Sequence, residues 1–422
     1  MLRHYVLLAL RHVRREPLAA LLNVFTLSLG LACFVTASAI IGFWQRADSR
    51  LATADRAFLV TSALSAPTAA EPRRLRPVST HYAAQYLKTD FPQLEAVGRV
   101  VPVNDNASYV AGDRSIRIRE YSADPDVPAI LDLPFVAGDR RTALAAPRSV
   151  VLTEQTATQL FGDEPALGKH VLLGALWDAT VTGVVRNIEE PSHMGRSATA
   201  PFPWDALSSR DLYETVLRTR FGSDTTMGPE NWANGGNFTY VLLPKDGSLT
   251  AEQLRAQRPA FVQRHVPLDQ QERMRLTLDL LPVPQILAKS TEGLFPNAGV
   301  SLAAILWTLG ALVLVVACVN YANLAIGRSA FRARAVGVRK AIGAGVLHIA
   351  AQSLVESALL TIAAWAVALV FVALLAPALT AAIGINVRLA LLADVRAWAG
   401  TLAIVTAVTL LSGALPASAL AR

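Results

Sequence analysis

Charged residues are absent from four long stretches of this chain. No Asp, Glu, Lys or Arg occurs at 18–45, 298–327, 357–387 or 397–421. Each stretch reaches the roughly 20 apolar residues that a helix needs to cross the hydrocarbon core of a bilayer. Because backbone polar groups in hydrocarbon must be paired within their own segment, each stretch is predicted to be a transmembrane helix.

The expected architecture is a membrane protein with four transmembrane α-helices in a 1+3 arrangement. The predicted spans are 18–44, 298–327, 347–376 and 397–421, and an extracytoplasmic domain is inserted after the first. A signal peptide is the alternative for the first run, cleaved after Ala37-Ser38-Ala39. The run stays apolar through Trp44, beyond the roughly 7–15 residues of a signal-peptide core, which favours an uncleaved helix.

Basic residues flank the predicted spans in two short segments. Residues 1–17 carry four Arg and one Glu, and residues 328–346 carry five basic and no acidic residues. The positive-inside rule makes both segments cytoplasmic. Both termini are then cytoplasmic, whereas 45–297 and the short turn 377–396 lie outside. The apolar and basic residues of 1–17 have the spacing of an amphipathic helix that lies on the inner membrane surface. A disordered basic anchor is the alternative for this segment.

The inserted region, 45–297, is predicted to be an α+β domain. Its polar and apolar residues alternate as in strands or helices, separated by turn residues. Strands are expected at 57–61, 96–103, 115–121, 149–152, 170–173, 180–185, 238–243 and 276–281. Helices are expected at 81–89, 154–161 and 251–265, with Thr80, Thr153 and Thr250 as N-caps. The polar stretch 189–237 is expected to be irregular.

The net charge of +7 does not indicate a nucleic-acid partner. The inserted region holds 27 basic and 29 acidic residues, so the excess of basic residues belongs to the segments that flank the membrane. The only cysteines, Cys33 and Cys318, fall within predicted spans. The inserted domain must therefore fold without disulfides, and membrane lipid rather than nucleic acid is the expected environment of the basic segments.

No catalytic, metal or cofactor site is predicted in this chain. None of the seven His forms an H-x-x-x-H or H-E-x-x-H pair, and no G-x-S-x-G elbow occurs. The nearest approach to a nucleotide-binding loop, from Gly162 to Gly168-Lys169, has one residue too many and continues with His170. Glu356 is the one acid within an apolar run, so it is either an intramembrane polar site or an interfacial residue.

The most specific segment is 317–344, ACVNYANLAIGRSAFRARAVGVRKAIGA. It resembles the signature of FtsX-like permeases of the MacB type. Further similarity lies in Ser149–Glu154, in Leu160–Glu164 and at Leu415-Pro416-Ala417. One departure is Ala335, which is commonly Glu in that family. The resemblance implies a loop at 328–346 that contacts the ATPase through Arg328, Arg332, Arg334, Val336, Gly337, Val338, Arg339, Lys340 and Gly343.

The resemblance implies the permease subunit of an ABC transporter in a bacterial cytoplasmic (inner) membrane. ATP and Mg²⁺ would bind a separate ABC ATPase. The permease would act as a homodimer or as a heterodimer with a related chain. Some members also use a periplasmic adaptor and an outer-membrane channel. The resemblance further implies mechanotransmission, in which ATP hydrolysis moves the extracytoplasmic domain, and export rather than import. The alternatives are an extracytoplasmic sensor or scaffold, and a membrane-anchored enzyme.

Overall fold

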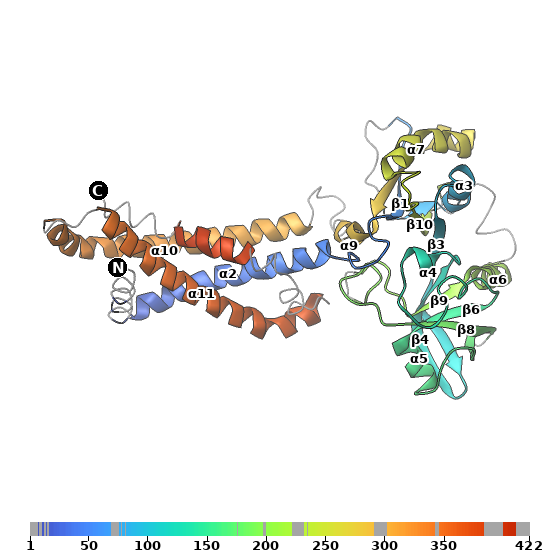
Figure 1. The fold of residues 1–422 in the computed structure, drawn as a ribbon, viewed down its shortest axis with the longest axis horizontal. Helices are drawn as coiled ribbons and strands as arrows, with labels where there is room; N and C mark the ends of the chain where they lie inside the picture. The colour runs from blue at the N-terminus through green and yellow to red at the C-terminus, as the bar shows by residue number, and fades with distance from the viewer. Residues whose placement is uncertain are drawn as a thin grey trace. The chain divides into compact units, whose positions relative to one another are not determined.

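The computed structural model divides into two compact units. Met1–Trp44 and Thr291–Arg422 form one, which we call the helical unit, and Gln45–Ser290 form the other, which we call the inserted domain. Figure 1 shows both. The structure describes residues 7, 11, 14, 17–68, 76, 78–80, 82–174, 176–196, 200–221, 232–233, 235–290, 302–341, 346–383 and 400–410.

Three long apolar helices dominate the described part of the helical unit. They are α2 (Pro17–Gln45), α10 (Leu302–Ala341) and α11 (Val346–Ile383). Each contains a stretch long and apolar enough to cross a membrane, at Ala20–Gln45, Ala303–Asn323 and Leu354–Ala381. Within the predicted fourth span, the described residues form a shorter apolar helix at Gly400–Leu410, so a fourth crossing is not confirmed.

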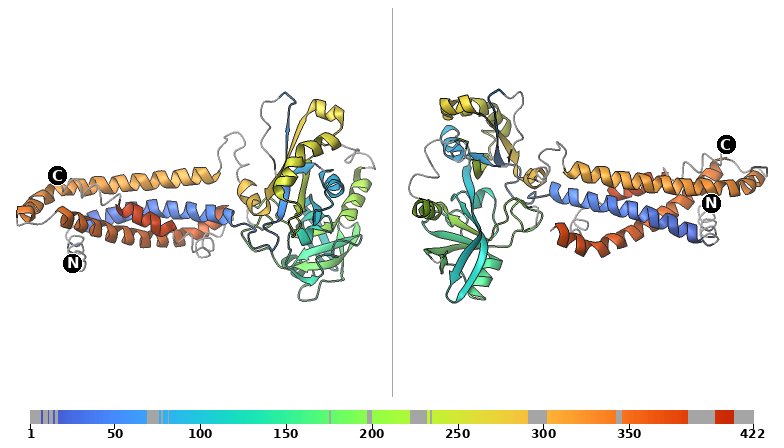
Figure 2. Two further views of the ribbon diagram at one scale, coloured as in Figure 1. Left: turned by 45° about the horizontal axis from the view of Figure 1, so that its top comes forward. Right: turned by 180° about the vertical axis from the view of Figure 1, so that it is seen from behind.

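These helices pack through small and apolar side chains. Figure 2 shows α2 and α10 running side by side in both of its views. The ring centroids of Phe34 and Trp307 lie 4.9 Å apart in an edge-to-face arrangement. A Cβ atom at Gly30 would lie 2.9 Å from the Cβ of Ala317, so the close approach of α2 and α10 requires a glycine there.

Helix α10 is longer than the sequence predicted. The second membrane helix was expected to end near Gly327 and to be followed by a loop at 328–346, but α10 continues without a break to Ala341. A glycine within a helix costs only about 1 kcal/mol relative to alanine, and the Ala and Arg residues around Gly327 are good helix formers. Positive charge marks the side of the membrane but does not end a helix, which is why the expected loop was wrong over 328–341.

The inserted domain is built on one mixed β-sheet, with eleven strands among the described residues. The strand order is β11-β1-β10-β3-β4-β9-β6-β8-β5, with β2 beside β10 and β7 beside β3 and β8. Neighbours are antiparallel except for the parallel pairs β4–β9 and β6–β8. The strands are β1 (Ala57–Ser65), β2 (Ser79–Thr80), β3 (Ala96–Ala111), β4 (Arg114–Ala123), β5 (Phe135–Gly138), β6 (Ser149–Thr153), β7 (His170–Leu173), β8 (Trp177–Val185), β9 (Ala206–Ser209), β10 (Gly235–Leu242) and β11 (Arg275–Pro282).

Short helices cover this sheet, and local capping explains where two of them begin. They are α3 (Ala83–Asp90), α4 (Val127–Ile130), α5 (Glu154–Phe161), α6 (Arg210–Phe221), α7 (Ala251–His265), α8 (Leu268–Arg273), the 3-10 turn η1 (Val283–Gln285) and α9 (Ile286–Ser290). Thr153 caps α5, and Thr250 forms a capping box with Gln253 at the start of α7. The predicted cap Thr80 is wrong, because Thr80 pairs with Gly235 in the sheet and α3 begins after Tyr82.

The described core lies on both faces of the sheet. Along β1, Ala57 and Leu59 belong to one apolar cluster, whereas Phe58 and Val60 belong to another. Because successive strand residues point to opposite faces, β1 is buried on both sides. The stretch 189–237, expected to be irregular, contributes β9 and α6 to this architecture, so that expectation was wrong in part.

Candidate functional site

The predicted ATPase-contacting residues lie along one continuous helix. Arg328, Arg332, Arg334, Val336, Gly337, Val338, Arg339 and Lys340 belong to α10, whereas Gly343 lies outside the described residues. The membrane-crossing stretch of α10 ends at Asn323, so eighteen further helical residues follow it. At 1.5 Å per residue, this extension is about 27 Å long. Positions 328, 332 and 339 recur at spacings of four and seven and so share one stripe of the helix.

Glu356 lies close to one end of a candidate span. It is the third residue of the stretch Leu354–Ala381 of α11 and is half-buried. The hydroxyl groups of the neighbouring Ser357 and of Tyr321 on α10 are 2.9 Å apart and buried. A polar contact between helices at this position is compatible with the interfacial role weighed for Glu356.

The sequence did not predict a buried polar network at the start of the inserted domain. We call residues 46–51, which directly follow α2, the strap. Asp48 in the strap is 5% exposed and has a φ of 55°, which is uncommon for a residue other than glycine. Its carboxylate accepts hydrogen bonds from the Ser192 hydroxyl at 2.6 Å and from the His193 backbone N–H at 2.9 Å. The Asp48 N–H donates to the carbonyl of Pro191 at 3.1 Å.

His193 extends this network to the middle of the sheet. Its Nδ1 lies 2.6 Å from a carboxylate oxygen of Asp48, and its Nε2 lies 3.0 Å from the hydroxyl of Tyr240 on β10. His193 and Tyr240 are 0% and 1% exposed. Burial, followed by the nearby charge of Asp48, raises the pKa of Tyr240 well above its ordinary value. Tyr240 therefore keeps its proton, and the chain that leaves α2 is tied to a central strand through two side chains.

The arrangement of Ser192, His193 and Asp48 is not that of a hydrolase. A serine nucleophile must be hydrogen-bonded to the imidazole that removes its proton. Here the Ser192 hydroxyl donates to Asp48 instead, and the Nε2 of His193 faces Tyr240. All three side chains are buried, so a substrate could not reach them. The network can fix the position of the strap, but it lacks the geometry for nucleophilic catalysis.

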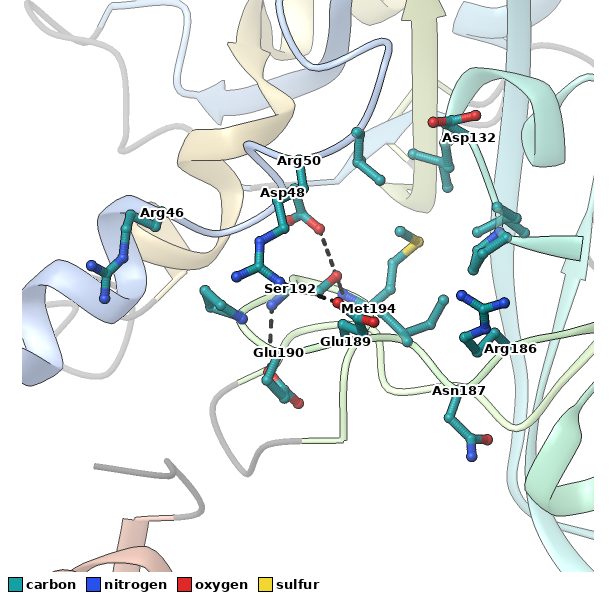
Figure 3. Close-up of a pocket in the computed structure, with 16 residues that line it drawn as sticks. Arg46, Asp48, Arg50, Asp132, Arg186, Asn187, Glu189, Glu190, Ser192 and Met194 are labelled. Carbon is teal, nitrogen blue, oxygen red and sulfur yellow. Dashed lines mark hydrogen bonds and ion pairs between the residues drawn. The ribbon is translucent and has the colours of Figure 1, made fainter. Parts of the chain in front are cut away.

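A pocket of about 250 Å³ lies beside this network (Figure 3). Three segments of the inserted domain line it, namely the strap, residues 131–134 and residues 186–194. Direct contacts hold these segments together. The N–H of Ala52, the residue after the strap, donates to Asp132, and the Arg186 N–H donates to the carbonyl of Pro134. We call this cavity the strap pocket.

A second buried carboxyl lies deeper in the sheet. Glu120 on β4 is 7% exposed. Burial raises its pKa to about 7, although the hydroxyl groups of Ser208 and Tyr109 favour the charged form. The pKa of the nearby Asp124 shifts in the opposite direction. Burial acts to raise the pKa of Asp124, but hydrogen bonds from Arg99 outweigh it and the pKa is lowered. Among the described residues, no group of His, Cys, Asp and Glu side chains could hold a metal ion.

Comparison with known proteins decides the family. A family model described as the MacB-like periplasmic core domain matches residues 20–257, which is more than half of the chain. The chain belongs to this MacB-like family. The membership confirms the resemblance to MacB-type ABC transporter permeases, and the apolar helices together with this domain make the chain a membrane protein with an extracytoplasmic segment. The matched region excludes 328–343, so the match does not test the ATPase-contacting residues.

Several solved structures are similar to part of this chain. A domain of a putative permease protein from Porphyromonas gingivalis is 18% identical, with a TM-score of 0.43, over 55% of this chain and 91% of that one. The periplasmic region of MacB from Actinobacillus actinomycetemcomitans is 12% identical, with a TM-score of 0.35, over 53% and 89%. The extracellular domain of the ABC-type transporter YknZ from Gram-positive bacteria is 14% identical, with a TM-score of 0.32, over 52% and 99%. No curated protein matched the chain. Because all three TM-scores are below 0.5, the family assignment depends on the family model.

Proposed function

We propose that this chain is a permease subunit whose α10 extension docks onto a separate cytoplasmic ABC ATPase. The observation that carries the proposal is the continuity of α10. This helix runs from a membrane-crossing stretch into a segment whose charged residues are all basic. A single helix resists bending far better than a loop does. A displacement of residues 328–341 would therefore be transmitted along the helix to the span at Ala303–Asn323.

Directly after α2, the strap is held firmly within the inserted domain. Asp48 lies three residues after the end of α2 and is held by buried hydrogen bonds to the loop 191–193. Movement of α2 would therefore be passed to the inserted domain at Asp48, and through His193 to β10. We propose that ATP hydrolysis by the partner moves the inserted domain in this way, and that the motion drives export of a substrate or triggers an extracytoplasmic partner.

The test is affinity purification of the tagged full-length chain from its native host in mild detergent, followed by mass spectrometry. One variant carries Arg339→Glu with Lys340→Glu. The matched control carries Arg388→Glu with Arg396→Glu, which reverses two charges in the turn expected on the opposite side of the membrane. We expect an ABC ATPase to accompany the wild type and the control, and to be lost from the first variant.

Absence of an ATPase from every sample, after crosslinking before lysis, would contradict the proposal and favour the sensor or scaffold alternative. Retention of the ATPase by the Arg339→Glu, Lys340→Glu variant would keep the transporter function but move the docking site away from this part of α10.

A further inference from the structure

The strap pocket is lined by four carboxylates and three arginines, and one of these arginines has no partner among the described residues. Four carboxylates line it, and each already has a partner: Asp48 has Ser192 and His193, Asp132 has Arg140 and the Ala52 N–H, Glu189 has Arg50, and Glu190 has the Ser192 N–H. Arg186 also lines the pocket, and its side chain is exposed. Among the described residues, no hydrogen bond or ion pair reaches its guanidinium. The Arg186 guanidinium is therefore available to an anionic group of a ligand.

The remaining walls of the pocket are apolar. They consist of Leu51, Leu131, Leu133, Pro134, Ile188 and Met194. Figure 3 shows Arg186 across the pocket from the labelled strap residues Arg46 and Arg50. A cavity of about 250 Å³ is large enough for a small polar headgroup.

Chain connectivity keeps the strap pocket close to the membrane. The membrane-crossing stretch of α2 ends at Gln45, Arg46 is the next residue, and Arg50 is five residues beyond the end. Five residues span at most about 18 Å even when fully extended. Arg46 and Arg50, which line the pocket, therefore stay within about 18 Å of the end of the membrane-crossing stretch.

We propose that the strap pocket binds the phosphodiester headgroup of a membrane phospholipid. Arg186 forms the charge-assisted hydrogen bonds to the phosphate, since a guanidinium matches phosphate oxygens in a two-pronged geometry. The apolar walls cover the glycerol carbons. Glu189 and Glu190 disfavour a doubly charged phosphate monoester, whereas a phosphodiester carries a single charge. The buried network at Asp48 holds the strap wall in place before the lipid arrives.

The test measures lipid binding to the purified full-length chain by native mass spectrometry. Phosphatidylglycerol, phosphatidylethanolamine and diacylglycerol with the same acyl chains are titrated separately, and inorganic phosphate is added as a competitor. We expect one tightly retained molecule of either phospholipid and none of diacylglycerol. Arg186→Glu is expected to weaken this binding about ten- to a hundredfold, which is the value of a charged hydrogen bond.

Two further variants make the outcome decisive. Arg117→Glu reverses another exposed arginine, on β4 and outside the pocket, and should bind lipid as the wild type does. Ile188→Trp fills the cavity from a half-buried position and should abolish binding without altering charge. Equal binding by the Arg186→Glu and Arg117→Glu variants, or by diacylglycerol and the phospholipids, overturns the proposal. Displacement of the lipid by millimolar inorganic phosphate also overturns it, in favour of a site for free anions. No ATPase is present, so the result is independent of the proposed coupling.

Discussion

Replacing Glu120 by Gln should remove a pH dependence of stability from the inserted domain. The carboxyl is 7% exposed, and its pKa is raised from 4.5 to about 7 by burial. Between these two values the folded state keeps a proton that the unfolded chain has released. The raised pKa of Glu120 therefore contributes to the free energy of unfolding. This contribution is fully present below pH 4.5 and is lost as the pH rises to 7.

The size of the effect follows from the shift. Each pKa unit corresponds to 1.36 kcal/mol, so Glu120 lowers the free energy of unfolding by roughly 3 kcal/mol between pH 4.5 and pH 7. A glutamine is neutral at every pH and has nearly the same shape. The Glu120→Gln variant should match the wild type near pH 4.5 and exceed its stability by up to roughly 3 kcal/mol above pH 7.

The assay is urea unfolding of residues 45–290, followed by tryptophan fluorescence at several pH values from 4.5 to 8. This segment is a compact unit with its own apolar clusters. The control is Glu272→Gln, which changes an exposed carboxyl. The difference between Glu120→Gln and the wild type cancels every other titrating group. A difference that stays constant across this pH range would refute the argument that burial controls this carboxyl.

Three further changes test other parts of the structure. Asp48→Asn keeps a residue that tolerates positive φ but cannot accept all of the donors around it, so urea unfolding of 45–290 should show a loss of about 2 kcal/mol. Thr250→Ala removes the capping box of α7 and should cost about 1 kcal/mol in the same assay. Gly327→Pro should interrupt α10 at a cost of about 3 kcal/mol. It should leave ATPase co-purification intact while removing any stimulation of ATP hydrolysis by substrate, whereas Gly327→Ala should preserve both.

Local sequence patterns predicted much of this fold because they report on nearest neighbours. The bounds of α5 and α7 were predicted as the structure has them, since Thr153 and Thr250 act within one turn of the helix they start. The eight predicted strands all coincide with described strands, because a run of strand-forming residues is a property of a single strand. The short strands β2, β5 and β9 were not predicted. Thr80 had the right chemistry for a cap. Its backbone is instead held by a strand more than 150 residues away, which no local pattern could reveal.

The strap network lay beyond sequence reasoning for the same physical reason. Asp48 and His193 are 145 residues apart, and Pro191-Ser192-His193 has no spacing that marks a partner for a lone aspartate. Asp48 lies only three residues after the end of a membrane helix, where a charge would usually remain in water, yet it is buried with its hydrogen bonds satisfied. A buried carboxylate costs several kcal/mol unless its partners are already in place. Burial of Asp48 therefore depends on the packing of loop 191–193 against the strap, and a change in that loop should destabilise the strap as well.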